Sequence, residues 1–375
     1  MDVVKEKKRL NGKNIISTKK KLILSLIFGG ISLILLIMCQ MIYGFGDWYN
    51  KYIYVWLVNT VCRIFSVVPF SVYEIILYSF IVYVLFRIVK NIYLLIKRKI
   101  KIKMKDILIR GASSLILYIS IFVFLNMITQ GVNCFKSSFA VSTNLDKKEV
   151  NKENLKELCI YLKDNLNELD KKIDKDEEGI FILENNYKEV GRENMYNLSK
   201  KYDCLKGFYP NPKSYIFSSL MSYQLLQGES TFTIEANYNR DMPKHNIPST
   251  ICHELSHIRG FNNEDEANYI SFLSCINSED YNYQYSGYIM AYVYCMDDLY
   301  YADKDAFIEI SKDTCAGVKK ELMLDDEFWQ PYRGFVSSVY NFIYDKLLKM
   351  VGQKNGIHSY NGVVKLLVSG YGIQY

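Results

Sequence analysis

Two of the four histidines in this chain of 375 residues stand in one short string, His253-Glu254-Leu255-Ser256-His257. Residues four apart on a helix project from the same face, so both imidazoles can bind one metal ion. Zinc takes such nitrogens in a tetrahedral site. Glu254 lies about 100° further round the helix, where its carboxylate can hold a water molecule instead of the metal. The string predicts a zinc site with ligands His253 and His257 and with Glu254 as the catalytic carboxylate.

The residues around this string carry the signals of a helix. Pro248 has a φ angle preset for a first helical turn, and Asn246 or Ser249 can cap the free amides there. Gly260 provides a natural stop. We therefore expect a helix that begins near Pro248 and ends before Gly260. A structural alternative is a pair of core histidines with an incidental glutamate on that same helix.

A catalytic zinc site needs a third protein ligand and leaves a fourth position for water. Glu264-Asp265-Glu266 follows His257 after six intervening residues. We expect a second helix to begin at Glu264 with Asn263 as its cap, which places Glu266 at the third position, where a capping box takes an acid. Glu264 is then the expected third ligand, and Glu266 is the alternative. Favourable charge at a helix start would also explain these acids.

Asn268 lies one helical turn beyond Glu264 and can orient a ligating histidine through a hydrogen bond. The pattern His253-Glu254-x-x-His257 with Glu264-x-x-Ala267-Asn268 resembles that of the glutamate zincins, in which the third ligand stands four residues before Asn or Asp. Membrane-bound prenyl-protein endopeptidases are similar, with Asp in place of Asn268. Metzincins are a poorer match, because Asn263 stands where they have a third histidine.

A wider resemblance covers most of the chain. The stretches 252–269 and Tyr285-Ser286-Gly287-Tyr288 resemble an uncharacterised bacterial family, domain-of-unknown-function family 3810. This resemblance implies a bundle of membrane helices followed by a zincin-like domain, and it implies no substrate.

Three segments are long and apolar enough to cross a bilayer, which takes about 20 apolar residues. They are 22–46, 68–88 and 107–128. A cleaved signal peptide is the alternative for the first, but its apolar stretch would be shorter. The segment 52–67 is apolar but contains Asn59 and Arg63, so we expect it at the membrane interface or re-entering the membrane and do not count it as a span.

Charge predicts how the spans are oriented. Residues 1–129 carry 19 Lys and Arg against 5 Asp and Glu, a net charge of +14, whereas residues 130–375 carry 27 against 35, a net charge of −8. The basic residues cluster before the first span and between the second and third, and such clusters stay in the cytoplasm. We therefore expect a multi-pass protein of the cell membrane with a cytoplasmic N-terminus and an extracytoplasmic C-terminal domain. Nothing in this pattern calls for a nucleic-acid partner.

The expected fold is mainly α, with membrane helices in 1–129 and a zincin-like α+β metallopeptidase domain with a small sheet in 130–375. Helices are expected over 151–172, 285–299 and 335–350 from their apolar spacing. Thr231 to Asn237 alternates loosely and is expected to form a strand. By resemblance to zinc peptidases, that strand would be an edge strand that pairs with substrate backbone; an ordinary structural strand is the alternative.

Several other residues have weaker claims to a role. Tyr285, Tyr288, His358 and Tyr360 are candidates for stabilising an oxyanion, although packing is the default for each tyrosine. His245 is expected to be a loop residue. The nine cysteines lack CxxC spacing, and most are expected to be small buried hydrophobic residues.

These features favour a membrane-anchored zinc metalloendopeptidase that acts on a peptide or protein substrate. The alternative is a membrane sensor or scaffold whose metal site is structural or binds a peptide without cutting it. A transporter is disfavoured, because the spans carry few charges beyond Glu74 and offer no obvious polar pathway.

Overall fold

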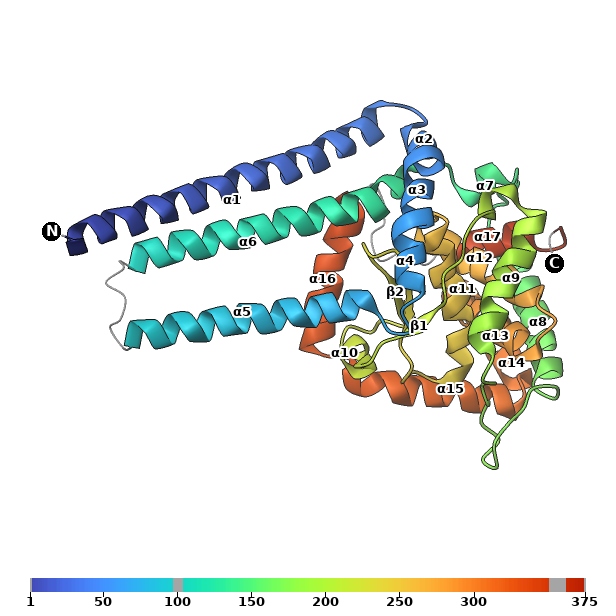
Figure 1. The fold of residues 1–375 in the computed structure, drawn as a ribbon. Helices are drawn as coiled ribbons and strands as arrows, with labels where there is room; N and C mark the ends of the chain where they lie inside the picture. The colour runs from blue at the N-terminus through green and yellow to red at the C-terminus, as the bar shows by residue number, and fades with distance from the viewer. Residues whose placement is uncertain (1, 97–103, 351–361, 374–375) are drawn as a thin grey trace.

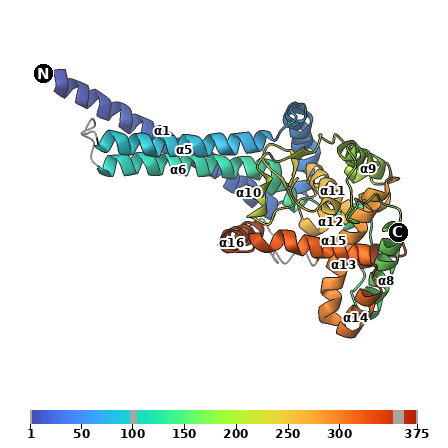
Figure 2. The ribbon, with the colours of Figure 1, turned by 90° about the horizontal axis from the view of Figure 1, so that it is seen from below.

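The computed structural model describes residues 2–96, 104–350 and 362–373. The protein is mainly α-helical, with three long apolar helices in its N-terminal region and a small sheet of three strands in the globular body, as predicted (Figure 1). The three long helices extend from one side of that body, and most of the remaining helices pack together within it (Figures 1 and 2).

The three long helices are α1 (Asp2–Met41), α5 (Val72–Ile96) and α6 (Met104–Asn126). Their membrane-compatible stretches are Ile16–Met41, Val72–Tyr93 and Leu108–Phe135, with mean hydropathies of 2.8, 2.0 and 2.0. These stretches are mostly exposed, so their apolar side chains suit contact with lipid. The first span ends earlier than expected, at Met41, because Gly44 turns the chain with a φ of +75°.

A helical segment from Phe45 to Ser66 joins the first span to the second. It alternates α and π geometry in the order α2 (Phe45–Tyr49), Asn50–Tyr54, α3 (Val55–Leu57), Val58–Cys62 and α4 (Arg63–Ser66). One face packs into the globular body, where Tyr54 is buried and donates a hydrogen bond to the carbonyl of His257. Trp48 and Trp56 on the other face are exposed. The segment is not among the three described helices that are long and apolar enough to cross a membrane.

The globular body is built mostly from helices of its own. They are α7 (Phe139–Ser142), α8 (Lys152–Leu169), α9 (Tyr187–Lys201), α10 (Ser218–Ser222), α11 (Ile247–Ile258), α12 (Glu264–Ile276), α13 (Tyr281–Ala302), α14 (Lys304–Asp313), α15 (Ala316–Trp329), α16 (Phe335–Met350) and α17 (Gly362–Gly370). Helices α11, α12 and α13 are buried along most of their lengths and form the centre of the core. The predicted helices over 151–172, 285–299 and 335–350 are confirmed as α8, part of α13 and α16.

The sheet contains β1 (Lys213–Ser214), β2 (Gly228–Ser230) and β3 (Ala236–Tyr238) in the order β1-β3-β2. Strand β3 runs parallel to β1 and antiparallel to β2, with Asn237 opposite Lys213 and Glu229. The small sheet was predicted, but the strand over Thr231 to Asn237 was wrong in extent and position. Only its last two residues are extended in β3, and β3 is the central strand, which leaves β2 at the edge beside α11.

The misassigned residues 231–235 form a turn. Ile234 has a φ of +56°, which breaks the extended conformation, and its N–H donates to the carbonyl of Thr231. Phe232 does not belong to a sheet face; its ring packs edge-on against Tyr73 and Phe122 of the long helices. The loose alternation of apolar residues therefore came from a loop that contacts the membrane helices.

Two buried carboxylates join α5 to the sheet. Glu235 accepts hydrogen bonds from the N–H groups of Val72 and Tyr73, which have no partner within the helix at its first turn. The same carboxylate pairs with Lys213 of β1, and both side chains are only 2% exposed. In return, Glu74 of α5 accepts hydrogen bonds from two backbone amides that follow β1. Glu74 thus has a structural role, and the second span is fixed rigidly to the sheet.

Replacing Glu235 with alanine should destabilise the folded protein by about 3–5 kcal/mol, because Lys213 would remain buried without its counter-ion. The measurement is thermal or urea unfolding of the full chain in lipid nanodiscs. Glu149→Ala is the control, since the Glu149–Lys365 pair is exposed and such pairs contribute about 0–1 kcal/mol. Equal losses for the two variants would contradict this account of how α5 is held.

Candidate metal centre

The helix that carries the His-Glu-x-x-His string is α11, and it has the predicted start and stop. Pro248 stands in its first turn, and Gly260 follows its end with a φ of +78°. A Cβ at Gly260 would come within 2.2 Å of the Asn50 side chain, so the position needs glycine for space as well as conformation. The predicted cap differs: Asn246 occupies the N-cap position, but its side chain donates to Asp325 instead.

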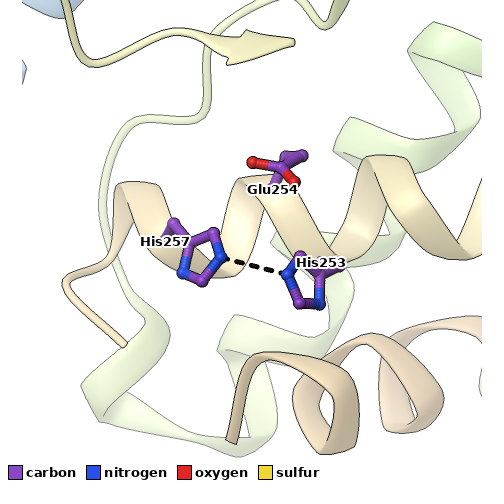
Figure 3. A group of neighbouring side chains, drawn as sticks. All are labelled: His253, Glu254 and His257. Atoms are coloured by element: carbon purple, nitrogen blue, oxygen red, sulfur yellow. Dashed lines mark hydrogen bonds between the residues drawn. The ribbon is translucent and has the colours of Figure 1, made fainter. Parts of the chain in front are cut away.

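The two imidazoles lie side by side on one face of α11 (Figure 3). Their Nε2 atoms are 3.0 Å apart, and the ring planes are perpendicular. Each Nδ1 has a separate partner 2.8 Å away: the Asn268 side-chain oxygen for His253, and the Phe261 carbonyl for His257. The predicted contact between Asn268 and a histidine of the string is confirmed.

These outer contacts fix which nitrogen carries the proton. The carbonyl of Phe261 only accepts hydrogen bonds, so His257 must be protonated at Nδ1. The Asn268 amide donates to the Tyr294 hydroxyl, which leaves its oxygen to accept from His253 Nδ1. In the neutral rings, both Nε2 atoms therefore present lone pairs to each other. Burial, aided by the neighbouring His253, lowers the pKa of His257 to about 4, which favours the neutral form that binds metals.

The Glu264 carboxylate completes this group from the first turn of α12. Its Oε2 lies 3.1 Å from Nε2 of His253 and 3.9 Å from Nε2 of His257, and all three side chains are 10–14% exposed. Its other oxygen accepts a hydrogen bond of 2.8 Å from Tyr344 of α16. Three electron-pair donors thus converge on one small space from two helices.

Their separations suit a single zinc ion. Two ligand atoms at about 2.0–2.1 Å from a tetrahedral zinc lie about 3.3 Å apart. The separations among the three donor atoms are 3.0, 3.1 and 3.9 Å, which bracket that value. Two lone pairs facing each other at 3.0 Å repel unless a proton or a cation lies between them. Among the described residues, His253, Glu254 and His257 form a group that could hold a metal ion; Glu264 as the third ligand and zinc as the metal remain predictions.

Glu266, the alternative third ligand, points elsewhere. Its carboxylate accepts a hydrogen bond of 2.6 Å from the backbone N–H of Phe139 and another from the Asn263 side chain. The expected capping box is not formed, because Asn263 makes no side-chain cap to the α12 amides. The start of the second helix at Glu264 is confirmed.

Glu254 is buried beside the imidazoles and is directed away from the space between them (Figure 3). One ligand atom from each of His253, Glu254 and His257 lies within 4.8 Å of the others. Burial raises the pKa of Glu254, and the charges of Glu264 and Glu229 raise it further. Its Oε2 is buried and accepts no hydrogen bond from any residue that the structure describes. A buried carboxylate oxygen of this kind is suited to receive a proton from a small bound molecule.

Strand β2 covers the Glu254 carboxylate. A Cβ at Gly228 would come within 2.5 Å of Glu254 Oε1, so glycine lets the strand approach this closely. The next residue, Glu229, accepts a hydrogen bond from Tyr215, and burial raises the pKa of Glu229 to about 7. The carboxyl groups of Glu229 and Glu254 therefore share one poorly hydrated region.

The tyrosines near the site were not those expected from the sequence. Tyr285 stacks on Phe181, and Tyr288 hydrogen-bonds with Tyr161, so both pack in the core. His358 and Tyr360 lie outside the described residues. The site instead receives Tyr344 and, stacked on it, Tyr340. Their spacing of four residues on an amphipathic helix was visible in the sequence, but it also fits ordinary core packing.

Two further expectations concern residues away from the site. His245 is buried and pairs with Glu321 at 2.8 Å, so it has a structural partner. The structure has no disulfide among the nine cysteines, and five of them are buried. The described group that could hold a metal ion contains no cysteine.

A matched pair of substitutions tests the third ligand. Glu264→Gln should weaken zinc binding by more than about 100-fold, because it removes a negatively charged donor from the group. Glu266→Gln should bind zinc like the wild type, since its amide oxygen can still accept from Phe139. Zinc affinity is measured by competition with a chelating dye on the purified full chain. The reverse order of effects would assign the ligand to Glu266.

Comparison with curated proteins and with solved structures gives no match. The family described as Protein of unknown function (DUF3810) matches residues 49–368, which include the long apolar helices α5 and α6, the sheet and both helices of the candidate metal centre. Because this match spans most of the chain, the protein belongs to the DUF3810 family.

Proposed function

We propose that this protein is a membrane-anchored zinc metallopeptidase, with His253, His257 and Glu264 as zinc ligands and Glu254 as the general base. The observation that carries the proposal is the convergence of two unprotonated imidazole nitrogens and a carboxylate oxygen within 3.0–3.9 Å of one another. The buried Oε2 of Glu254 beside them supplies the second requirement, a proton acceptor that is not used by the fold.

Zinc bound by these residues would supply Lewis acidity, which lowers the pKa of a water molecule and polarises a peptide carbonyl. Glu254 accepts the proton of the attacking water at Oε2 and passes it to the leaving amine nitrogen. Asn268 and the Phe261 carbonyl hold the rings with Nε2 free for the metal. Tyr344 holds the carboxylate of Glu264 in place through its second oxygen.

The edge strand β2 offers a place for the substrate backbone. It pairs with β3 on one side, and its Gly228 lies against Glu254. An extended peptide added to the other side of β2 would run past the general base with its backbone fixed by hydrogen bonds. The resemblance to zinc peptidases had offered this role to the strand expected over Thr231 to Asn237; we assign it to β2 instead.

A non-catalytic sensor or scaffold is the second candidate, and the low exposure of the three ligand side chains favours it. Structural zinc sites are usually closed by four protein ligands, whereas catalytic sites keep one position for water. Glu254 is the residue that distinguishes the metallopeptidase from the sensor or scaffold. A structural metal site does not need a buried carboxylate oxygen that accepts no hydrogen bond, whereas a peptidase needs one as its general base.

The proposed topology places the N-terminus in the cytoplasm and residues 130–375 outside the membrane. The basic residues before the first span and in the loop around residue 100 support it, because positive loops are retained in the cytoplasm. Three spans then bring the globular body to the outer face.

Glu254→Gln should abolish cleavage while zinc remains bound, because the amide cannot accept the proton but keeps the shape of the side chain. The loss of a general base lowers the rate by about 10²–10⁴-fold. New protein N-termini are quantified in cells producing the wild type or the variant. Glu309→Gln on the exposed surface is the control. Cleavage that persists in Glu254→Gln would exclude the proposed mechanism, and zinc binding without cleavage by the wild type would favour the sensor.

Protease added to intact cells should degrade an epitope inserted beside the exposed Tyr301 and spare one at the N-terminus. The expectation follows from the placement of the positive loops. The fragments are detected by immunoblot, with lysed cells as the control. Protection of the Tyr301 epitope until lysis would reverse the assigned orientation.

A further inference from the structure

Helix α16 lies across the direction of the three spans. It crosses the direction of α5 and α6 in Figure 1, is seen nearly end-on in Figure 2, and sits near their ends closest to the globular body. If α1, α5 and α6 cross a bilayer, α16 lies in the plane of its surface.

The two faces of α16 differ in what they contact. Five apolar residues fall within an arc of about 120° at about 100° per residue, and they are 42–83% exposed. They are Phe335, Val336, Val339, Phe342 and Ile343. Tyr340 and Tyr344 lie outside this arc, on the side toward the globular body. The helix is therefore amphipathic with its larger apolar face turned outward, the reverse of a helix that only packs on a core.

The tyrosine face covers the candidate metal centre. Tyr344 donates a hydrogen bond of 2.8 Å to Glu264, and Tyr340 stacks on Tyr344 with ring centroids 5.7 Å apart. Burial raises the pKa of Tyr340, and the nearby carboxylates of Glu229 and Glu264 raise it further. One helix thus has the proposed ligand Glu264 on one face and an exposed apolar surface on the other.

Three observations identify the bilayer as the partner of the apolar face. The face lies at the level where the apolar spans enter the globular body. A second exposed apolar group is held beside α5, where Phe217 packs edge-on against Tyr78 and Leu220 is half exposed. The exposed Lys346 and Lys349 stand on the same side of α16 at its C-terminal end, where long basic side chains can reach lipid headgroups while their stems lie along apolar surface, although Lys349 also pairs with Asp345.

We propose that α16 is an interfacial helix whose apolar face docks into the boundary between headgroups and acyl chains, while its tyrosine face covers the metal centre. Docking relies on the placement of the spans and on the exposed side chains, so it holds whether or not the protein cleaves peptides. The bilayer then bounds the candidate site on one side, about one helix diameter away.

Photo-crosslinking of the full chain tests the docking directly. Phe342 is replaced with p-benzoylphenylalanine, and the protein is illuminated in nanodiscs of phosphatidylcholine and phosphatidylglycerol. Mass spectrometry should find lipid adducts at this position at a yield similar to that of the same probe at Val82, which lies in the second span. The probe at Tyr301, which is 81% exposed on α13, should give few. Equal yields at positions 342 and 301, or adducts between two protein copies at 342, would overturn the proposal.

Hydrogen exchange supplies a second readout that needs neither zinc nor a substrate. Phe342→Asp removes apolar contact from an exposed position, so the fold should persist while α16 leaves the bilayer. Exchange of the α16 amides in nanodiscs should become at least about tenfold faster. Val293→Asp is the matched control, because Val293 is similarly exposed on α13. Unchanged exchange in Phe342→Asp would contradict docking.

Discussion

The structure of the candidate site depends on one constraint, the orientation of two imidazoles by acceptors behind them. The Phe261 carbonyl and the Asn268 oxygen take the Nδ1 protons, which forces the Nε2 lone pairs to face each other. That arrangement is unfavourable by itself and becomes favourable around a cation. The turn after α11 and the first turns of α12 supply both acceptors and the Glu264 carboxylate, so the helix pair and the site are one unit.

The same region is tied to the membrane helices. Tyr54, in the segment between the first two spans, hydrogen-bonds to the carbonyl of His257. Glu235, just before β3, accepts hydrogen bonds from the first backbone amides of α5, and Glu74 of α5 accepts hydrogen bonds from the backbone amides that follow β1. Because β2 of that sheet lies against Glu254, the spans, the sheet and the metal helix form a continuous set of contacts.

Local patterns predicted the elements whose signals are contained in short stretches. The three spans, the start and stop of α11, the start of α12 at Glu264 and the partner of His253 could all be read from spacing and residue type. The rest depends on contacts between distant residues. The turn at Ile234 follows from a local φ that the pattern does not encode. The edge position of β2 follows from the pairing of β3 with both other strands, and the approach of Tyr344 to Glu264 joins residues 80 apart in the chain. Phe232 looked like a strand residue because its partners, Tyr73 and Phe122, are far away in the sequence.

The central claim is tested most directly by X-ray absorption at the zinc edge on the purified full chain. The account predicts one zinc per chain, coordinated by two imidazoles and by carboxylate and solvent oxygens at about 2.0–2.2 Å, with the imidazole signal reduced in His253→Ala. A protein that retains no zinc, or one whose zinc shows sulfur neighbours at about 2.3 Å, would contradict it.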